Sequence, residues 1–150
     1  MAQGYDTLAA LFTAEDTPIV VACHTTASLE RAWQAYTTPD AIMRWNAASD
    51  DWHCPEARND LRPGGAFCYR MAARDGSFAF DYEGTWEVVE APHRLVQQFA
   101  GRHVWIRFAP TEVGTLVTVT FDPDGQASRE LQEAGWQAIL NRFAAVAATP

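Results

Sequence analysis

Three residues of this sequence are of types that could take part in acid–base chemistry inside an apolar interior. Tyr69, Tyr82 and Gln97 lie in segments rich in hydrophobic residues, and each side chain could form a hydrogen bond to a carbonyl group. A fourth residue, Glu83, would have a raised pKa if it were buried, but alternation along its segment places it on the outer face. This set leaves open an enzyme of the cyclase or dehydratase type, without identifying any catalytic residue.

Metal binding and nucleophilic catalysis by cysteine have weaker support in the sequence. Cys23 and His24 are adjacent, as are His53 and Cys54, and neighbouring residues on a strand point to opposite faces. Neither pair can therefore chelate one ion easily, and no Cys-x-x-Cys or His-x-x-x-His spacing is present. A reactive thiol at Cys54 or Cys68 would need an electropositive setting, which this acidic chain does not offer. We expect no metal, no cofactor and no catalytic cysteine.

The composition is that of an ordinary globular protein. The chain has 150 residues, of which 48% are hydrophobic and 20% are charged, so it can bury a substantial core. We predict a single domain spanning residues 1–150, with a core at about 17–148 and a peripheral segment at 1–16. The net charge of −8 repels phosphate backbones, so nucleic acid is not an expected partner. All basic residues are Arg, and the absence of Lys excludes Schiff-base chemistry.

The cysteines and the N-terminal residues bear on the compartment. The three cysteines form an odd and sparse set, and the first twelve residues carry no basic residue and only a short apolar run. No apolar stretch approaches the roughly 20 residues needed to span a bilayer. We therefore expect a soluble, cytoplasmic protein without membrane insertion.

Two periodicities divide the chain into helices and strands. Residues 19–23 form a β-branched run that predicts a strand, and Ser28 can cap a helix that ends before Pro39. Asp40 can cap a shorter second helix that carries Trp45. From residue 52 to 121, turn signals such as Asp75-Gly76 separate candidate strands, and residues 128–148 return to a helical period. This order predicts an α+β fold with about six or seven antiparallel strands.

Alternation in the strands predicts which side chains face the helix. Even positions from Phe78 to Val88 are mostly aromatic or apolar, whereas several odd positions are acidic, as expected for a sheet with one solvated face. By the same reasoning, three residues in each of two further strands point inward: Phe67, Tyr69, Met71, Val117, Val119 and Phe121. The sequence contains six Trp, eight Phe and four Tyr, and bulky rings gathered where sheet and helix meet often leave space between them.

The last helix has one polar line and one apolar face. Glu130, Glu133, Gln137 and Asn141 form the polar line at about 100° per residue. The opposite side contains Leu131, Gly135, Ile139 and Val146, with Trp136 and Phe143 on one shoulder. Because glycine disfavours a helix interior, we expect a strand or a ligand to approach the backbone closely at Gly135. Arg142 lies near this apolar face, and its charged group needs a carboxylate partner or contact with solvent.

The order of short motifs along residues 17–148 resembles the helix-grip SRPBCC (START-like) superfamily, and in particular the bacterial proteins named after the activator of the heat-shock-protein-90 ATPase. The motifs are Trp33, Thr38-Pro39-Asp40, Trp45, Asp60-Leu61-Arg62-Pro63-Gly64-Gly65, Tyr82-Glu83-Gly84, Pro92-His93-Arg94-Leu95-Val96 and Gly135-Trp136. These motifs are structural in character: Gly64-Gly65 suits a tight turn, and Asp60 and Arg62 can fix it by an ion pair. Turn or cap duty is likewise expected of Asp122-Pro123-Asp124-Gly125.

The resemblance implies a curved antiparallel sheet wrapped around a long C-terminal helix, with two short helices after the first strand and a hydrophobic cavity. The expected function is noncatalytic binding of a small apolar ligand, either lipid-like, polyketide-like or aromatic. The cyclase or dehydratase remains one alternative, and a stress-related or co-chaperone-like interaction domain, with a homodimer or an apolar patch near Trp45 and Trp52, is another. The expected cavity-lining residues are Trp45, Phe67, Tyr69, Met71, Phe78, Phe80, Tyr82, Trp86, Gln97, Phe99, Gly135, Trp136 and Ile139.

Overall fold

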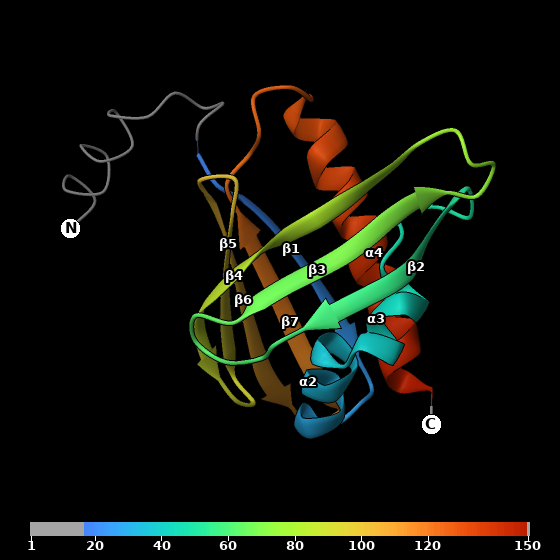
Figure 1. The fold of residues 1–150 in the computed structure, drawn as a ribbon. Coiled ribbons are helices and arrows are strands. Elements are labelled where there is room, and N and C mark those ends of the chain that lie inside the picture. The colour runs from blue at the N-terminus through green and yellow to red at the C-terminus, as the bar shows by residue number, and fades with distance from the viewer. Residues whose placement is uncertain (1–16, 150) are drawn as a thin grey trace.

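A computed structural model describes residues 17–149, which form one antiparallel sheet of seven strands together with three helices (Figure 1). The elements are β1 (Ile19–Thr25), α2 (Leu29–Thr37), α3 (Pro39–Trp45), β2 (Trp52–Asn59), β3 (Ala66–Ala73), β4 (Ala79–Glu90), β5 (Arg94–Phe99), β6 (Arg102–Thr111), β7 (Gly114–Phe121) and α4 (Arg129–Ala148). The α+β class and the predicted order of elements are confirmed. The predicted peripheral segment 1–16 lies outside the described residues.

Strands β2 to β7 form a meander, and β1 pairs with β7 as the edge strand of the sheet. Its order is β1-β7-β6-β5-β4-β3-β2, and every neighbouring pair is antiparallel. The predicted hairpin turn at Asp75-Gly76 is present: Gly76 has φ +78°, and the Asp75 side chain accepts a 2.8 Å hydrogen bond from the Ser77 amide. Glycine reaches this left-handed region at low cost, which explains the tight connection between β3 and β4.

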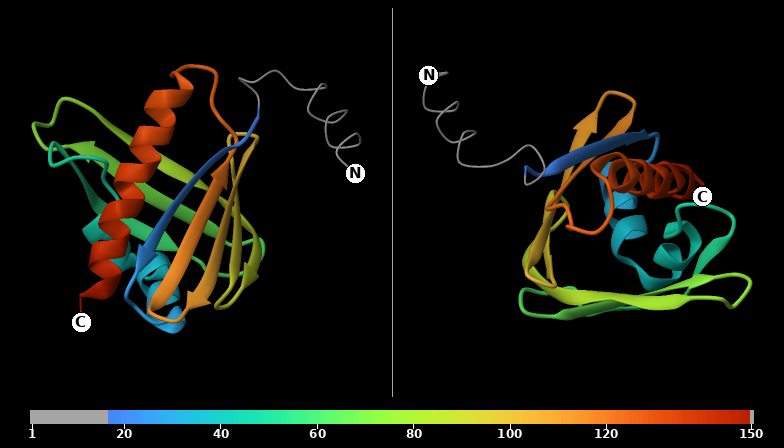
Figure 2. Two further views of the ribbon diagram at one scale, coloured as in Figure 1. Left: turned by 180° about the vertical axis from the view of Figure 1, so that it is seen from behind. Right: turned by 90° about the horizontal axis from the view of Figure 1, so that it is seen from above.

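The sheet curves around the helices, as the view from above in Figure 2 shows. Helix α4 runs over the concave side and packs along β1, while α2 and α3 cover one end of the sheet. Trp33 and Tyr36 of α2 contact Phe108 of β6 with ring centroids 5.4 and 5.5 Å apart. Gln137, on the predicted polar line of α4, donates a 2.8 Å hydrogen bond to the Ala22 carbonyl oxygen at the free edge of β1. The helices therefore support the curvature of the sheet from its concave side.

Of the two predicted helix caps, Ser28 is confirmed and Asp40 is not, and the structure adds a cap at Ser128. Ser28 accepts a hydrogen bond from the Arg31 amide at the start of α2, and Ser128 accepts one from the Leu131 amide at the start of α4. The prediction that Asp40 caps the second helix is wrong, because α3 begins at Pro39. Asp40 instead lies in the first turn, where a carboxylate interacts favourably with the helix dipole. No helix among residues 17–149 combines the length and the hydrophobicity needed to cross a bilayer.

Strand alternation holds in β3 and β7 but not along all of β4. Phe67, Tyr69 and Met71 are buried, as are Val117, Val119 and Phe121. In β4, a register shift between Trp86 and Val88 makes Val89 pack against the core in place of the predicted Val88. Phe78 precedes the strand and is 59% exposed, because the β3–β4 hairpin projects sideways beyond α4 (Figures 1 and 2).

Candidate functional site

A cavity of about 350 Å³ lies between the concave face of the sheet and α4. Most of the residues predicted to line a cavity border this one. The sheet contributes Tyr69, Met71, Phe80, Tyr82, Gln97 and Phe99. The helices contribute Trp45, Gly135, Trp136 and Ile139. Elements that are far apart in the sequence therefore place these side chains around one cavity. That these side chains bind a ligand stays a prediction.

Three of the predicted residues, Phe67, Trp86 and Phe78, do not border the cavity. The first two lie in the packed core, where their ring centroids are 5.4 Å apart. The indole of Trp86 donates a 2.6 Å hydrogen bond to Asn59, whose amide donates to the Thr37 carbonyl oxygen at the end of α2. Asn59 thus fixes the sheet against the helical layer, a role for which the sequence offers no signal.

Phe78 lies on the outside with two further aromatic residues. Its ring centroid is 6.2 Å from that of Trp52 and 6.0 Å from that of Phe80. Phe80 is 46% exposed and also borders the cavity, so this aromatic cluster lies beside one opening. Trp45 was expected near an exposed patch with Trp52, but it is buried, because its ring packs between Tyr36 and Phe143. An interaction surface near Trp52 stays a prediction.

The walls of the cavity are held in place by contacts between aromatic rings. Trp136 of α4 stacks on Phe121 of β7 with centroids 4.7 Å apart and an interplanar angle of 22°. Tyr82 of β4 meets Phe99 of β5 edge to face at 4.8 Å. Such pairs contribute about 0.5–1.5 kcal/mol beyond their buried area, so the rings resist rotation into the empty space.

Neutral polar groups lie on the inner wall of the cavity. The Tyr82 hydroxyl donates a 2.8 Å hydrogen bond to Oε1 of Gln97, whose side chain is almost fully buried. The hydroxyl of Tyr69 and Nε2 of Gln97 have no hydrogen-bond partner within the described part of the chain. Burial raises the pKa of Tyr69 and of Tyr82 well above the usual range, so both phenols stay protonated at neutral pH.

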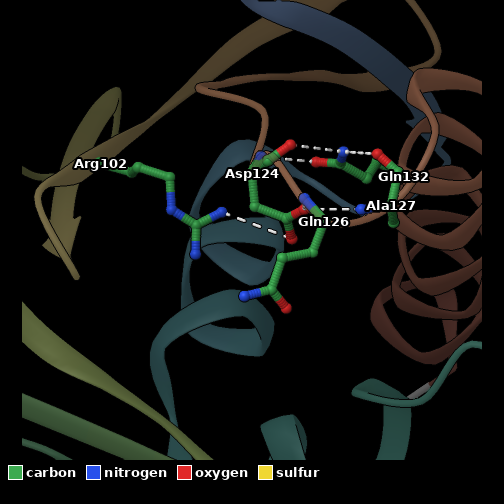
Figure 3. A network of polar contacts seen from close by, with 5 residues as sticks. All are labelled: Arg102, Asp124, Gln126, Ala127 and Gln132. Atoms are coloured by element: carbon green, nitrogen blue, oxygen red, sulfur yellow. Dashed lines mark hydrogen bonds and ion pairs between the residues drawn. The ribbon is translucent and has the colours of Figure 1, made fainter.

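Among residues 17–149, the charged residues that border the cavity are Arg102, Asp122 and Asp124, and Figure 3 shows the network around Arg102 and Asp124. The Asp124 carboxylate accepts hydrogen bonds from the amides of Gln126 and Ala127 at 2.9 and 3.1 Å and lies 3.6 Å from Nη1 of Arg102. Gln132 of α4 donates to the Asp124 carbonyl oxygen and accepts from its amide. The two amide hydrogen bonds, aided by Arg102, lower the pKa of the Asp124 carboxyl.

This network agrees with the predicted turn role of the Asp124 segment, whereas the N-terminal cap of α4 is Ser128. The loop between β7 and α4 is held to the mouth of the cavity, where Arg102, Asp122, Asp124 and Gln132 all border it. Their position at the rim was not predicted. It depends on the β5–β6 turn meeting the end of β7, which local spacing cannot reveal.

No strand approaches Gly135 closely, and the alternative that a ligand does so stays a prediction. A Cβ atom placed there would meet nothing within 4 Å, because this side of α4 faces the cavity. Leu131, predicted to face the sheet, borders the mouth and is 69% exposed. Arg142 does find a carboxylate, that of Asp50, and Arg62 pairs with Asp60 at 3.0 Å, as predicted.

The cysteines are not arranged for catalysis. Burial raises the pKa of Cys23 to about 12 and that of Cys54 to about 11, so both remain thiols at neutral pH. Thiols are poor nucleophiles compared with thiolates. The two cysteines belong to β1 and β2, which are the opposite edges of the sheet. A nucleophilic role for either residue has no support in this geometry.

One group on the outer face of the sheet could hold a metal ion by proximity alone. Ligand atoms of Cys68, Asp81 and Glu83 lie within 4.8 Å of one another. Asp81 already pairs with Arg70 at 3.2 Å, and the pKa of Cys68 is raised, first by burial and then by Asp81, which disfavours the thiolate that a metal requires. Exposed acidic groups commonly lie this close together without an ion.

A curved antiparallel sheet that grips a C-terminal helix around an apolar cavity is the helix-grip architecture of SRPBCC proteins. Within this class, residues 26–148 match the model of the family described as "Activator of Hsp90 ATPase homolog 1-like protein". The chain belongs to this family. The fold commonly binds hydrophobic ligands.

Solved structures of related proteins agree with this assignment. The chain is 45% identical to an AHSA1-like protein from Aeromonas hydrophila, with a TM-score of 0.81 and coverage of 86% of this chain and 90% of that chain. It is 40% identical to Chr148 from Cytophaga hutchinsonii, with a TM-score of 0.73 and coverage of 87% and 90%. CV1439 from Chromobacterium violaceum shares the fold at 22% identity, with a TM-score of 0.80 and coverage of 89% and 99%. No match was found among curated proteins.

Proposed function

We propose that this protein binds a small hydrophobic or aromatic molecule in the cavity between the sheet and α4, without catalysis. The observation that carries this proposal is the cavity of about 350 Å³, which is bordered mainly by aromatic and aliphatic side chains. Small-molecule sites have volumes of roughly 300–1,000 Å³ and combine apolar walls with a few polar groups. A molecule of two or three fused or linked rings is of the appropriate size.

The cavity is maintained by the architecture around it. Trp136 and Ile139 come from α4, whereas Tyr82 and Phe99 come from strands that hydrogen bonds hold in register. The ring pairs between Trp136 and Phe121 and between Tyr82 and Phe99 leave the walls little freedom to close over the space. Burial of apolar ligand surface would contribute about 25 cal/mol per Å² toward binding.

The polar groups favour binding over catalysis. The buried phenols of Tyr69 and Tyr82 have raised pKa values, so they act as hydrogen-bond donors and not as bases. Asp81 and Glu83, the carboxylates on either side of Tyr82 in sequence, lie on the exposed face of β4. The Asp124 carboxylate at the rim accepts two backbone hydrogen bonds, which disfavour its protonation.

A binding experiment with a blocked cavity tests this proposal. Native mass spectrometry and calorimetry on a panel of small aromatic and lipid-like molecules should find one-to-one complexes with the wild-type protein. Gly135→Phe should abolish them, because the new ring enters the open space beside Gly135. Ala134→Phe is the matched control, since Ala134 is exposed and does not border the cavity. If no panel member binds, or if a folded Gly135→Phe protein binds as well as wild type, the proposal is wrong.

A further inference from the structure

Two buried polar groups on the inner wall of the cavity have unused hydrogen-bonding capacity. The side chains of Tyr69 and Gln97 belong to residues that are only 3% and 2% exposed, and both border the cavity. The Tyr69 hydroxyl and Gln97 Nε2 have no partner among the residues that the structure describes. An unpaired polar group in an apolar environment costs free energy, and folded proteins retain few of them. These two groups are therefore candidates for direct contact with a ligand.

The orientation of the Gln97 amide is set by Tyr82. Tyr82 donates a 2.8 Å hydrogen bond to Gln97 Oε1, which leaves the amide NH₂ group as a buried donor, without a partner in the described residues, on a side chain that borders the cavity. Turning the amide over would deprive the buried Tyr82 proton of this acceptor. Tyr69 lies on β3 next to β4, and its ring centroid is 5.9 Å from that of Tyr82, so Tyr69 and Gln97 are both neighbours of Tyr82.

The two donors define the chemistry of the group that they can bind. Gln97 Nε2 offers N–H donors, and a protonated Tyr69 offers an O–H donor, so the complementary ligand group is an oxygen that accepts more than one hydrogen bond. A carboxylate would need a cation. Arg102 is the cation that borders the cavity within the described residues, and it lies at the rim beside Asp124. The inner wall therefore suits an uncharged acceptor.

We infer, building on the proposed function, that the cavity is selective for neutral ring compounds that carry a carbonyl oxygen, which accepts hydrogen bonds from Gln97 Nε2 and the Tyr69 hydroxyl. The carbonyl would reach these buried donors from the cavity that both residues border. The aromatic side chains around it contact the ring skeleton of the ligand. Tyr82 is a positioning residue, because it acts through Gln97 and not on the ligand itself.

Affinities for benzophenone and diphenylmethane test this inference, because the two compounds differ only by C=O in place of CH₂. Transfer from water alone favours diphenylmethane, the less polar compound. The wild-type protein should nevertheless bind benzophenone about tenfold more tightly, as expected for one or two satisfied hydrogen bonds. Titration calorimetry or quenching of intrinsic Trp fluorescence gives both dissociation constants.

Variants assign the preference to the two donors. Tyr69→Phe and Gln97→Met should each reduce the ratio of benzophenone affinity to diphenylmethane affinity at least several-fold. Met71→Leu, an apolar change at another residue that borders the cavity, should alter both affinities together and preserve their ratio. Circular dichroism checks that each variant is folded. If Gln97→Met does not fold, Tyr69→Phe still tests the inference, because it retains the Tyr82–Gln97 hydrogen bond.

The outcomes separate this inference from the proposed function. Equal affinities, a preference for diphenylmethane, or a preference that survives both donor variants would overturn carbonyl recognition and leave an apolar binding protein. Failure to bind either compound, while other aromatic molecules of the panel bind, would overturn it as well. If nothing in the panel binds, the proposed function is wrong and the inference with it.

Discussion

The hydroxyl of Tyr82 on β4 donates a 2.8 Å hydrogen bond to Oε1 of Gln97 on β5, in a cavity whose other walls are largely apolar. This contact joins two neighbouring strands on their concave face. It also determines which end of the amide is presented to the cavity. A polar pair in such a position costs desolvation free energy, which is offset only while both partners are present.

Removal of the Tyr82 hydroxyl should destabilise the protein. Tyr82→Phe leaves Gln97 Oε1 buried without a donor, so we expect the free energy of unfolding to fall by about 1–3 kcal/mol. Urea denaturation followed by circular dichroism measures this change. In a Gln97→Met background the same substitution should cost less, because the acceptor is already absent. Equal costs in the two backgrounds would show that the hydrogen bond contributes nothing.

Gly135 should tolerate alanine. A Cβ atom there meets nothing within 4 Å, and glycine in a helix interior is about 1 kcal/mol less favourable than alanine. Gly135→Ala should therefore raise the free energy of unfolding by up to about 1 kcal/mol. The measurement is thermal or urea unfolding beside wild type. A clear loss of stability would mean that the backbone of α4 is closely packed at this point, contrary to the structure.

Gly84 should not tolerate alanine. A Cβ atom on this β4 residue would lie 2.0 Å from the Gln98 carbonyl oxygen of β5, which is backbone and cannot move aside cheaply. Gly84→Ala should lower the free energy of unfolding by roughly 1–3 kcal/mol or prevent folding, as overpacking does in cores. The opposite signs expected for Gly84→Ala and Gly135→Ala make the pair a test of the cavity that is independent of any ligand. Stability like that of wild type in Gly84→Ala would contradict the tight β4–β5 spacing.

Asp124 should make stability depend on acid pH. Its pKa is lowered, chiefly by the hydrogen bonds from Gln126 and Ala127, so the folded state favours the carboxylate more than the unfolded chain does. The stabilisation is fully present above the unfolded pKa of about 4 and is lost as pH falls through the lower folded value. Because the side chain is 38% exposed, solvent screens the effect and we expect it to be modest.

Unfolding measured at several pH values below about 5 checks this expectation against variants. Asp124→Asn should flatten the acid dependence relative to wild type. Glu133→Gln removes an exposed carboxylate of α4 and keeps the loop network, so its acid dependence should resemble that of wild type. Identical profiles for wild type and Asp124→Asn would rule out this contribution.

The three cysteines should differ in accessibility to a thiol reagent. Cys23 and Cys54 are buried with raised pKa values, whereas Cys68 is half-buried on the outer side of β3. At about pH 8, an aromatic disulfide reagent should modify Cys68 first and the other two only on unfolding. Cys68→Ser should remove the first phase of the reaction. Fast modification of Cys23 or Cys54 in the folded protein would contradict their burial.

The local sequence accounts for most of the secondary structure, because it reports which backbone conformation each segment favours. Period two placed Phe67, Tyr69 and Met71 on one face, and Asp75-Gly76 supplied the turn that returns the chain. The caps at Ser28 and Ser128 follow from side chains that bind nearby amides. Each of these features depends on residues within a few positions of one another.

Alternation along a strand assigns a face, but it does not say what covers that face. Phe78, Trp86 and Tyr82 share one parity, yet Phe78 is exposed, Trp86 is packed in the core and Tyr82 borders the cavity. The difference comes from where the β3–β4 hairpin passes beyond α4 and from Asn59, which holds Trp86 toward α2. The register shift after Trp86, which places Val89 instead of Val88 against the core, likewise depends on the pairing of β4 with β5.

The sequence alone thus determined the order and type of the elements, the acidic character of the surface and the abundance of rings available for a cavity. Only the tertiary structure decided which rings border empty space, that Gly135 faces it, and that Arg102 meets Asp124 at its rim. The physical reason is the range of the interactions involved. Backbone preference and periodicity act over a few residues, whereas a cavity is a gap left among side chains from strands and helices that are distant in sequence.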